Sequence, residues 1–179
     1  MRKIIHKWFW PWDFDKEEAW LNEMVSKGLC MISYGWCRYE FEKCEPGEYS
    51  IRLQMLENSH SHPESEQYLE FIESTGAEHI GSWWKWIYLR KKRSDGEFEI
   101  FSDFESKIKH LTLIMGLLLF IGLFNIFIGF MNLFMMINLE SPGNSIGFLN
   151  VILGVICTLG YIRLYRKRKK LKNDSVLFE

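Results

Sequence analysis

The chain has 179 residues, and 22 lysines and arginines against 23 aspartates and glutamates give it a formal net charge of -1. This near-neutral total hides an asymmetry, because the region from Asp13 to Glu78 is acidic and the C-terminal tail is strongly basic. A basic tail that follows an apolar segment is typical of membrane topology signals, so direct binding of nucleic acid is not expected. Residues 1–95 are enough for one small domain and too few for two.

The N-terminal 95 residues show alternating strand and helix patterns. The expected strands are residues 2–10, 29–44, 49–56 and 77–92, and the expected helices are residues 15–27 and 64–75. In residues 49–55, apolar and polar side chains alternate with period two, as in a half-buried strand. Gly28 and Gly76 follow the helices and can take the left-handed conformation that ends a helix. The predicted order is therefore βαββαβ.

An internal repeat supports this order. A shift of 48 residues places Trp20 on Tyr68, Leu21 on Leu69, Met24 on Ile72, Gly28 on Gly76, Ile32 on Ile80 and Trp36 on Trp84. Two similar βαβ halves predict an α+β fold of the ferredoxin-like type, in which two helices cover one face of a four-stranded antiparallel sheet. Trp20 and Phe71 are the expected core residues of the two helices.

The open face of such a sheet must be polar or must meet a partner. Most of the eight tryptophans fall in this domain, and one layer of helices cannot bury them all. In the last strand, Trp84 and Trp86 are expected to share one face and Trp83 to lie on the other. The residues expected to bind a partner, a ligand or a second copy are Trp8, Trp10, Trp36, Trp83, Trp84 and Trp86. Cover by loops or by the segment before the membrane is the alternative.

The sequence holds no recognisable catalytic motif. Cys30, Cys37 and Cys44 recur every seven residues in one extended segment, so Cys37 is expected on the opposite face and the three do not converge on a metal. A reducing cytoplasmic setting argues against a disulfide. Glutamates such as Glu17 and Glu18 are expected on solvated helix faces, and there is no phosphate loop or dinucleotide fingerprint. We therefore expect no enzyme, no catalytic residue, no metal and no cofactor.

Two apolar segments without charges, residues 111–138 and 145–162, follow the domain. A helix needs about 20 apolar residues to cross a bilayer, and the second segment reaches this length if Arg163 snorkels to the headgroups. The sequence predicts transmembrane helices at residues 111–138 and 145–165, an amphipathic connector at residues 96–110 and a basic tail at residues 166–179. The first helix is expected to begin near Asp103 and to run unbroken into the bilayer. A buried hairpin of a soluble protein is the alternative.

Small and amide side chains recur along both spans at spacings of three and four residues. These residues are Gly122, Asn125, Gly129 and Asn132 in the first span and Gly147, Asn150 and Gly154 in the second. Small residues let helices approach closely, and asparagine can hydrogen-bond across the contact. The spans are therefore expected to pack on each other, or on copies in a homodimer. A polar track for a substrate is the functional alternative.

Basic residues predict the orientation of this hairpin. Lys107 and Lys109 precede the first span and residues 166–170 follow the second, whereas the loop at residues 139–144 has Glu140 and no lysine or arginine. The positive-inside rule places both termini in the cytoplasm. The N-terminus lacks the apolar region of a signal peptide.

Four stretches are similar to a known family: residues 14–24 (FDKEEAWLNEM), 41–49 (FEKCEPGEY), 81–86 (GSWWKW) and 98–108 (FEIFSDFESKI). Over about residues 8–110 the chain resembles the bacterial membrane proteins grouped as the domain of unknown function 2812 family. The resemblance implies a Gram-positive source, hence the bacterial cell membrane, and a gene often beside a PadR-type transcriptional regulator. It implies no activity and no catalytic residues.

These patterns favour a membrane-anchored cytoplasmic regulatory or sensing module whose domain binds a protein partner, with a PadR-type regulator as the first partner to test. A small-molecule receptor that uses the aromatic sheet face is one alternative, and an accessory subunit of a membrane transporter is another. A flat aromatic patch would favour the first function and an aromatic-lined concavity the second. Glycine and asparagine stripes turned toward another protein would favour the third.

Overall fold

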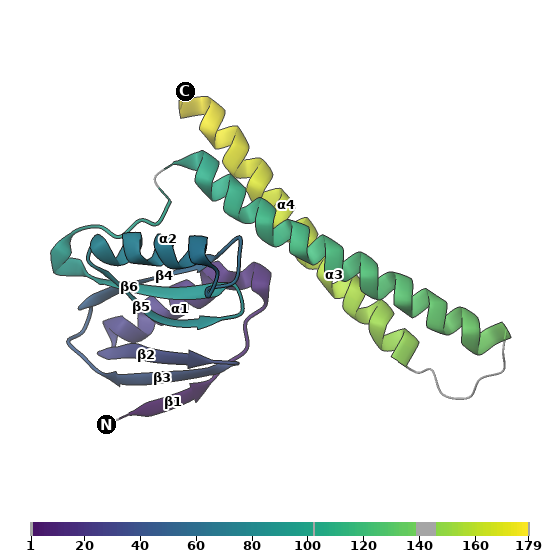
Figure 1. Ribbon diagram of the computed structural model, residues 1–179, viewed down its shortest axis with the longest axis horizontal. Coiled ribbons are helices and arrows are strands. Elements are labelled where there is room, and N and C mark those ends of the chain that lie inside the picture. Colours follow the sequence, from purple (N-terminus) through teal and green to yellow (C-terminus); the bar gives the residue numbers. More distant parts are fainter. Residues whose placement is uncertain (1, 102, 139–145, 179) are drawn as a thin grey trace. The chain divides into compact units, whose positions relative to one another are not determined.

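The computed structural model describes residues 2–101, 103–138 and 146–178, so the expected loop at residues 139–144 lies outside the described part. The chain forms two compact units, residues 1–102 and residues 103–179. The first unit mixes helices with antiparallel strands, and the second is a pair of long helices (Figure 1). In chain order the elements are β1 (Lys3–His6), α1 (Phe14–Ser26), β2 (Leu29–Gly35), β3 (Arg38–Lys43), β4 (Tyr49–Met55), α2 (Pro63–Ser74), β5 (Ala77–Trp83), β6 (Trp86–Lys92), α3 (Phe104–Asn138) and α4 (Ile146–Phe178).

The strands form two three-stranded antiparallel sheets, a first sheet in the order β1-β3-β2 and a second in the order β4-β6-β5. The ferredoxin-like topology is therefore not confirmed. The prediction of single strands at residues 29–44 and 77–92 is wrong, because each segment is a hairpin with a two-residue loop. The loops are Trp36-Cys37 and Trp84-Lys85, with positive φ at Cys37 and Trp84. Neither loop contains the glycine, asparagine or proline that usually identifies such a turn.

The internal repeat extends through these hairpins, so its unit is βαββ rather than βαβ. The two halves, β1-α1-β2-β3 and β4-α2-β5-β6, have the same chain order and the same strand order within their sheets. Residues 48 positions apart have matching roles in the two halves. Gly28 and Gly76 both follow a helix and have positive φ. The register of each hairpin shifts at Ile32 and at Ile80, and Trp36 and Trp84 are the first residues of the two loops.

The second sheet is buried on the face that packs against α2. Ile87 and Leu89 of β6 join Ile72 of α2 in one hydrophobic cluster. Phe98 is buried in the same cluster and Ile100 packs against it, although neither lies in a helix or strand. The segment that was expected to connect the domain to the membrane therefore begins by completing the core of the domain.

Helix α1 packs against the outer edge of β4 and binds backbone groups there. Asn22 Nδ2 donates to the Ile51 carbonyl at 2.9 Å, and Asn22 Oδ1 accepts from the Ile51 N–H at 3.0 Å. Glu18 Oε2 accepts from the Leu53 N–H at 3.0 Å. An open strand edge is a template for pairing with another chain, and these bonds close the edge of β4.

The two aromatic residues expected in the core differ in their burial. Trp20 is half-buried and lies edge-on to Tyr39, with ring centroids 4.9 Å apart, and edge-on to Phe41. Phe71 is 63% exposed, so its assignment to the core is wrong. The neighbouring Ile72 takes the buried position, because the face of α2 that contacts the second sheet passes through Ile72 rather than Phe71.

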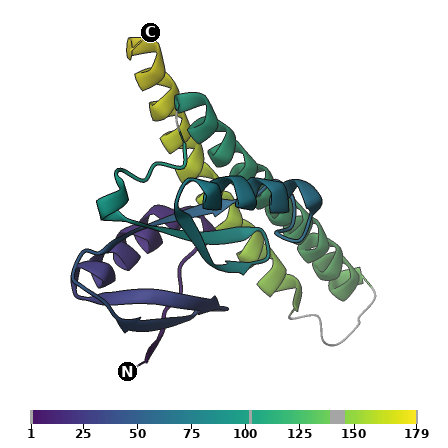
Figure 2. The same cartoon turned by 60° about the vertical axis from the view of Figure 1, so that its left-hand side comes forward.

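Helices α3 and α4 lie side by side (Figures 1 and 2), and both are long and apolar enough to cross a membrane. Helix α3 begins at Phe104, which confirms the expected start, and the Asp103 carboxylate accepts a hydrogen bond from the Ser106 N–H at 2.6 Å. It then runs unbroken to Asn138. Helix α4 continues through the basic residues 166–170 to Phe178.

Replacing Asn22 with alanine should lower the free energy of unfolding of the N-terminal unit by about 1–3 kcal/mol, because it leaves the N–H and carbonyl of Ile51 without their partner. Urea unfolding of residues 1–102 measures this change. The matched control is Asn58→Ala, which removes one exposed hydrogen bond to Glu64 and should cost less than about 0.5 kcal/mol. Equal effects of the two substitutions would contradict the edge-closing role of α1.

Candidate functional site

Strands β2 and β5 bring the two sheets together. A β-carbon on Gly81 would lie 3.3 Å from the Tyr34 nitrogen. Arg90, which forms an ion pair with Glu78 at 2.7 Å, donates to the Met31 carbonyl at 3.3 Å. Tyr34 thus lies beside Gly81, and Arg90 links Met31 to Glu78. The two pairs are separated by the same number of residues in the sequence, so β2 and β5 run in the same direction, as Figure 1 shows. The hairpin loops that follow β2 and β5 therefore emerge at the same end of the domain.

This end carries most of the exposed tryptophans of the domain. Trp36 is 68% exposed in the first loop, and Trp83 and Trp84 are exposed at the second. The segment after β1 joins them, because the Lys7 N–H donates to the Cys37 carbonyl at 3.0 Å. Within this segment the Trp10 ring stacks on Trp12, and the Trp8 ring meets Trp10 edge-on. We call the exposed group the aromatic end: Trp8, Trp10, Trp36, Trp83 and Trp84.

Trp86 does not belong to this group. It is only 8% exposed and packs against Phe14, with ring centroids 5.7 Å apart. The expectation that Trp84 and Trp86 share a sheet face is wrong, because Trp84 lies in the loop and Trp86 begins β6. Strand alternation applies only within a strand, and the unrecognised turn breaks it.

Trp84 is held in a strained backbone conformation. Its φ is 55°, in the left-handed region that a bulky residue rarely adopts. The segment between β4 and α2 holds this loop in place. Lys85 Nζ donates to the Glu57 carbonyl, and His60 Nδ1 lies 3.4 Å from the Trp84 carbonyl oxygen. Strain of this kind persists only where surrounding contacts enforce it, and it is concentrated at functional positions.

A buried carboxyl group joins α1 to both sheets. Glu17 is only 8% exposed, so its expected position on a solvated helix face is wrong. Its Oε1 accepts hydrogen bonds from the hydroxyls of Tyr39 in β3 and Tyr88 in β6, each at 2.6 Å. The Tyr34 ring packs on Tyr88 with centroids 4.3 Å apart. The helical spacing of the sequence could have indicated this burial, because Glu17 lies between the buried Phe14 and Leu21 on one face of α1.

Burial governs the protonation of this cluster. Desolvation raises the pKa of Glu17, and the hydrogen bonds from Tyr39 and Tyr88 oppose that shift only in part. Burial, together with the neighbouring carboxylate, raises the pKa of both tyrosines above their usual range, so they remain hydrogen-bond donors. The Glu17 carboxyl group therefore takes up a proton more readily than an exposed carboxyl group does.

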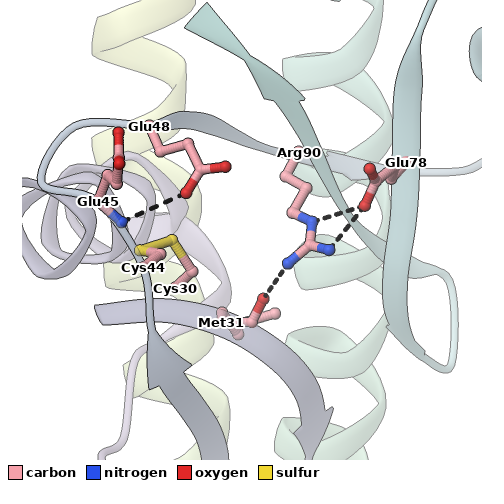
Figure 3. The surroundings of a disulfide bond; sticks show 7 residues. All are labelled: Cys30, Met31, Cys44, Glu45, Glu48, Glu78 and Arg90. Carbon is pink, nitrogen blue, oxygen red and sulfur yellow. Dashed lines mark hydrogen bonds and ion pairs between the residues drawn. A yellow bond between two sulfur atoms is a disulfide. The ribbon is translucent and has the colours of Figure 1, made fainter. Parts of the chain in front are cut away.

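Cys30 and Cys44 form a disulfide with Cα atoms 5.8 Å apart (Figure 3). The expectation of no disulfide is therefore wrong. Cys37 has a free thiol in the loop of the same hairpin. The physical reason is the turn itself, because it folds residues 29–43 back on themselves and pairs Leu29 with Lys43. Cys30 and Cys44 then meet at the open end of the hairpin, away from Cys37.

The glycines of the two long helices face each other. A β-carbon on Gly129 would lie 3.0 Å from the Gly147 carbonyl oxygen, and one on Gly154 would lie 2.9 Å from the Gly122 carbonyl oxygen. These short distances show that the backbones of α3 and α4 approach each other closely at the glycines. The helix pair is thus held at two levels by glycine on both sides of the contact.

The asparagines contribute less uniformly to this contact. Asn125 Nδ2 donates to the Ile121 carbonyl of its own helix at 2.9 Å. The β-carbon of Asn132 lies beside Gly147, and Asn150 is half-buried. Large apolar side chains, among them Phe120, Phe124 and Phe127, are exposed elsewhere on α3, as lipid-facing residues would be.

Replacing Gly154 with valine should separate α3 from α4, because a β-carbon there overlaps Ile126 and approaches the Gly122 carbonyl. The helical circular dichroism of the full chain, titrated with SDS in mixed micelles, should be lost at a lower SDS fraction. Gly116→Val is the matched control, since a β-carbon on Gly116 meets nothing within 4 Å. An equal shift for both variants would show that the glycine contact does not hold the pair.

Replacing Glu17 with glutamine should change how stability depends on pH. The raised pKa means that the contribution of Glu17 is fully present below its unfolded pKa and is lost as pH rises through the folded pKa. The free energy of unfolding of residues 1–102 should be measured between about pH 4 and pH 8 for both proteins. As pH rises, the stability of the Glu17→Gln variant should increase relative to that of the unchanged protein.

The exposed Glu23 supplies a control of opposite sign. Its hydrogen bond to Lys27 lowers its pKa, so its contribution is present at high pH and is lost as pH falls. The Glu23→Gln variant should consequently show its largest loss of unfolding free energy, relative to the unchanged protein, at neutral pH. Parallel curves for the unchanged protein and Glu17→Gln would rule out a shifted pKa at Glu17.

Comparison with known protein families identifies a match. The profile of the family described as protein of unknown function (DUF2812) matches residues 13–123, which include Glu17, the cysteine pair, both hairpin loops and the first part of α3. No match was found among the curated proteins or among the solved structures. Because the matched residues make up more than half of the chain, the protein belongs to the DUF2812 family.

Proposed function

We propose that this protein is a membrane-anchored regulatory module that binds a protein partner through its aromatic end. The observation that carries the proposal is the exposure of tryptophans from three separate segments at one end of the domain, with Trp84 held there against its backbone preference. Tryptophan is enriched among the residues that dominate binding energy at protein interfaces. Exposed aromatic rings on short, fixed loops also lose little conformational entropy on binding.

The helix pair would serve as the anchor. Both helices have the length and composition of membrane spans. By the positive-inside rule, the basic residues before the first span and after the second support a two-span hairpin in the bacterial cell membrane with both termini in the cytoplasm. The glycines of α3 and α4 face each other, which favours an anchor over a transporter subunit whose small-residue face awaits another protein.

A PadR-type transcriptional regulator is the first partner to test, because the family resemblance associates such genes with this one. Sequestration of a regulator at the membrane would be the simplest consequence of binding. The aromatic residues lie in the two hairpin loops, at the end of β5 and in the segment after β1, which favours a protein surface as the partner over a small molecule enclosed by side chains.

Replacing Trp84 with glycine should weaken partner binding without destabilising the domain. The glycine removes the exposed ring and relieves a positive φ that costs of order 1 kcal/mol. Loss of one interface tryptophan typically costs about 2 kcal/mol, roughly a 30-fold loss of affinity. The measurement is affinity purification of the intact protein from its native membrane, with quantification of the proteins that copurify.

Phe71→Ala is the matched control, because Phe71 is an exposed aromatic residue near the C-terminal end of α2, outside the aromatic end. Proteins retained by the unchanged chain and by Phe71→Ala, but lost from Trp84→Gly, are the expected result. An unchanged set of copurifying proteins with Trp84→Gly would contradict binding through the aromatic end. The thermal midpoint of each variant shows whether the domain has remained folded.

A further inference from the structure

We propose that Cys30, Cys44 and Glu48 form a binding site for a thiophilic divalent metal ion of the Zn²⁺ class when the disulfide is reduced. The two sulfur atoms and a carboxylate oxygen of Glu48 all lie within 4.8 Å of one another. Zn–S bonds of about 2.3 Å and Zn–O bonds of about 2.1 Å place the ligand atoms of a tetrahedral site about 3.5–3.8 Å apart. Opening the disulfide brings the three atoms toward that spacing through side-chain rotation alone.

The backbone that carries these ligands is fixed without help from the sulfur atoms. Cys30 lies within β2, and the Cys44 N–H donates to the Gly28 carbonyl at 3.1 Å. The Glu48 N–H donates to the Glu45 carbonyl at 3.1 Å, and Glu48 Oε2 accepts from the Glu45 N–H at 3.3 Å. Figure 3 shows the arrangement of the three residues around the disulfide. Because these backbone hydrogen bonds do not involve the sulfur atoms, we expect them to persist after reduction.

The surroundings suit a bound cation with one open position. Cys30 is 2% exposed, whereas Cys44 and Glu48 are half-buried, so solvent reaches the site from one side. Three protein ligands and a water molecule make up a common four-coordinate zinc site.

Disulfide and metal site are alternative states of the same residues. A thiolate of an external dithiol attacks one sulfur and the Cys30–Cys44 bond breaks, which frees one protein thiolate and leaves a mixed disulfide. The second thiol of the reductant then attacks the reductant sulfur of the mixed disulfide and displaces the other protein thiolate. The products are two protein thiols and an oxidised dithiol, and metal binding then releases the two thiol protons. A cytoplasmic domain would be kept in the reduced state. This inference does not depend on the aromatic end or on a protein partner.

The test uses the full chain in detergent, reduced with a phosphine and titrated with Co²⁺ as a spectroscopic probe, followed by displacement with Zn²⁺. We expect thiolate-to-cobalt absorption that saturates at one ion per chain in the reduced protein and is absent from the oxidised protein. Cys37→Ser is the matched control and should bind as the unchanged chain does, because Cys37 lies at the other end of the hairpin. Cys44→Ser should abolish the absorption.

Glu48→Gln keeps both sulfur atoms and should weaken binding by at least about tenfold, since even outer-shell partners contribute 10- to 100-fold. This variant keeps the test decisive if Cys44→Ser fails to fold, which far-ultraviolet circular dichroism reports. The proposal is overturned by a reduced chain without thiolate-to-cobalt absorption, by unchanged affinity in Glu48→Gln, or by loss of binding in Cys37→Ser.

Discussion

The carboxyl group of Glu17 is the point at which α1 and both sheets are bonded together. It accepts one hydrogen bond from a tyrosine of each sheet, and removing a buried carboxyl group from water without such partners costs several kcal/mol. The two sheets therefore cannot separate without exposing or orphaning this group. Asn22 and Glu18, one turn apart on the same helix, extend the contact to the edge of β4. With α1 fixed in this way, β2 and β5 lie together and their loops meet at the aromatic end.

The duplicated βαββ unit has not produced two equivalent halves. Helix α1 contacts β3 of its own half through Trp20 and also closes the edge of β4 in the other half, whereas α2 covers the face of the sheet that β4, β6 and β5 form. Strand β1, the counterpart of β4, is almost entirely exposed. Basic residues around Ile4 on this strand are consistent with solvation of the edge, because charge discourages pairing with another chain.

Two features of the first hairpin lie at its opposite ends. The loop carries Trp36 and belongs to the aromatic end, and the open end carries the Cys30–Cys44 pair. Cross-links between neighbouring strands limit local opening of a hairpin, so reduction or metal binding at one end bears on the rigidity with which the other presents its tryptophan. The long helices form a separate unit in which glycines of α3 and α4 face each other.

Much of the local structure could be predicted from the sequence. The two helices of the domain, the strand at residues 49–55 and the start of α3 near Asp103 follow from periodicity and capping, which involve residues within one or two turns of each other. The repeat at 48 residues was also visible, because matched side chains such as Gly28 and Gly76 serve the same local role in both halves. The long apolar helices needed only their length and lack of charge.

Which distant residues meet depends on contacts between elements that no single segment of sequence specifies. The loops at Trp36 and Trp84 lack turn residues of the usual kind, so contacts across each hairpin had to fold residues 29–44 and 77–92. The pairing of Cys30 with Cys44 followed from that turn, and the burial of Glu17 followed from the approach of Tyr39 and Tyr88 from two sheets. A pattern within one segment specifies which of its side chains share a face, but the energy of a buried polar group depends on what the rest of the chain places opposite it.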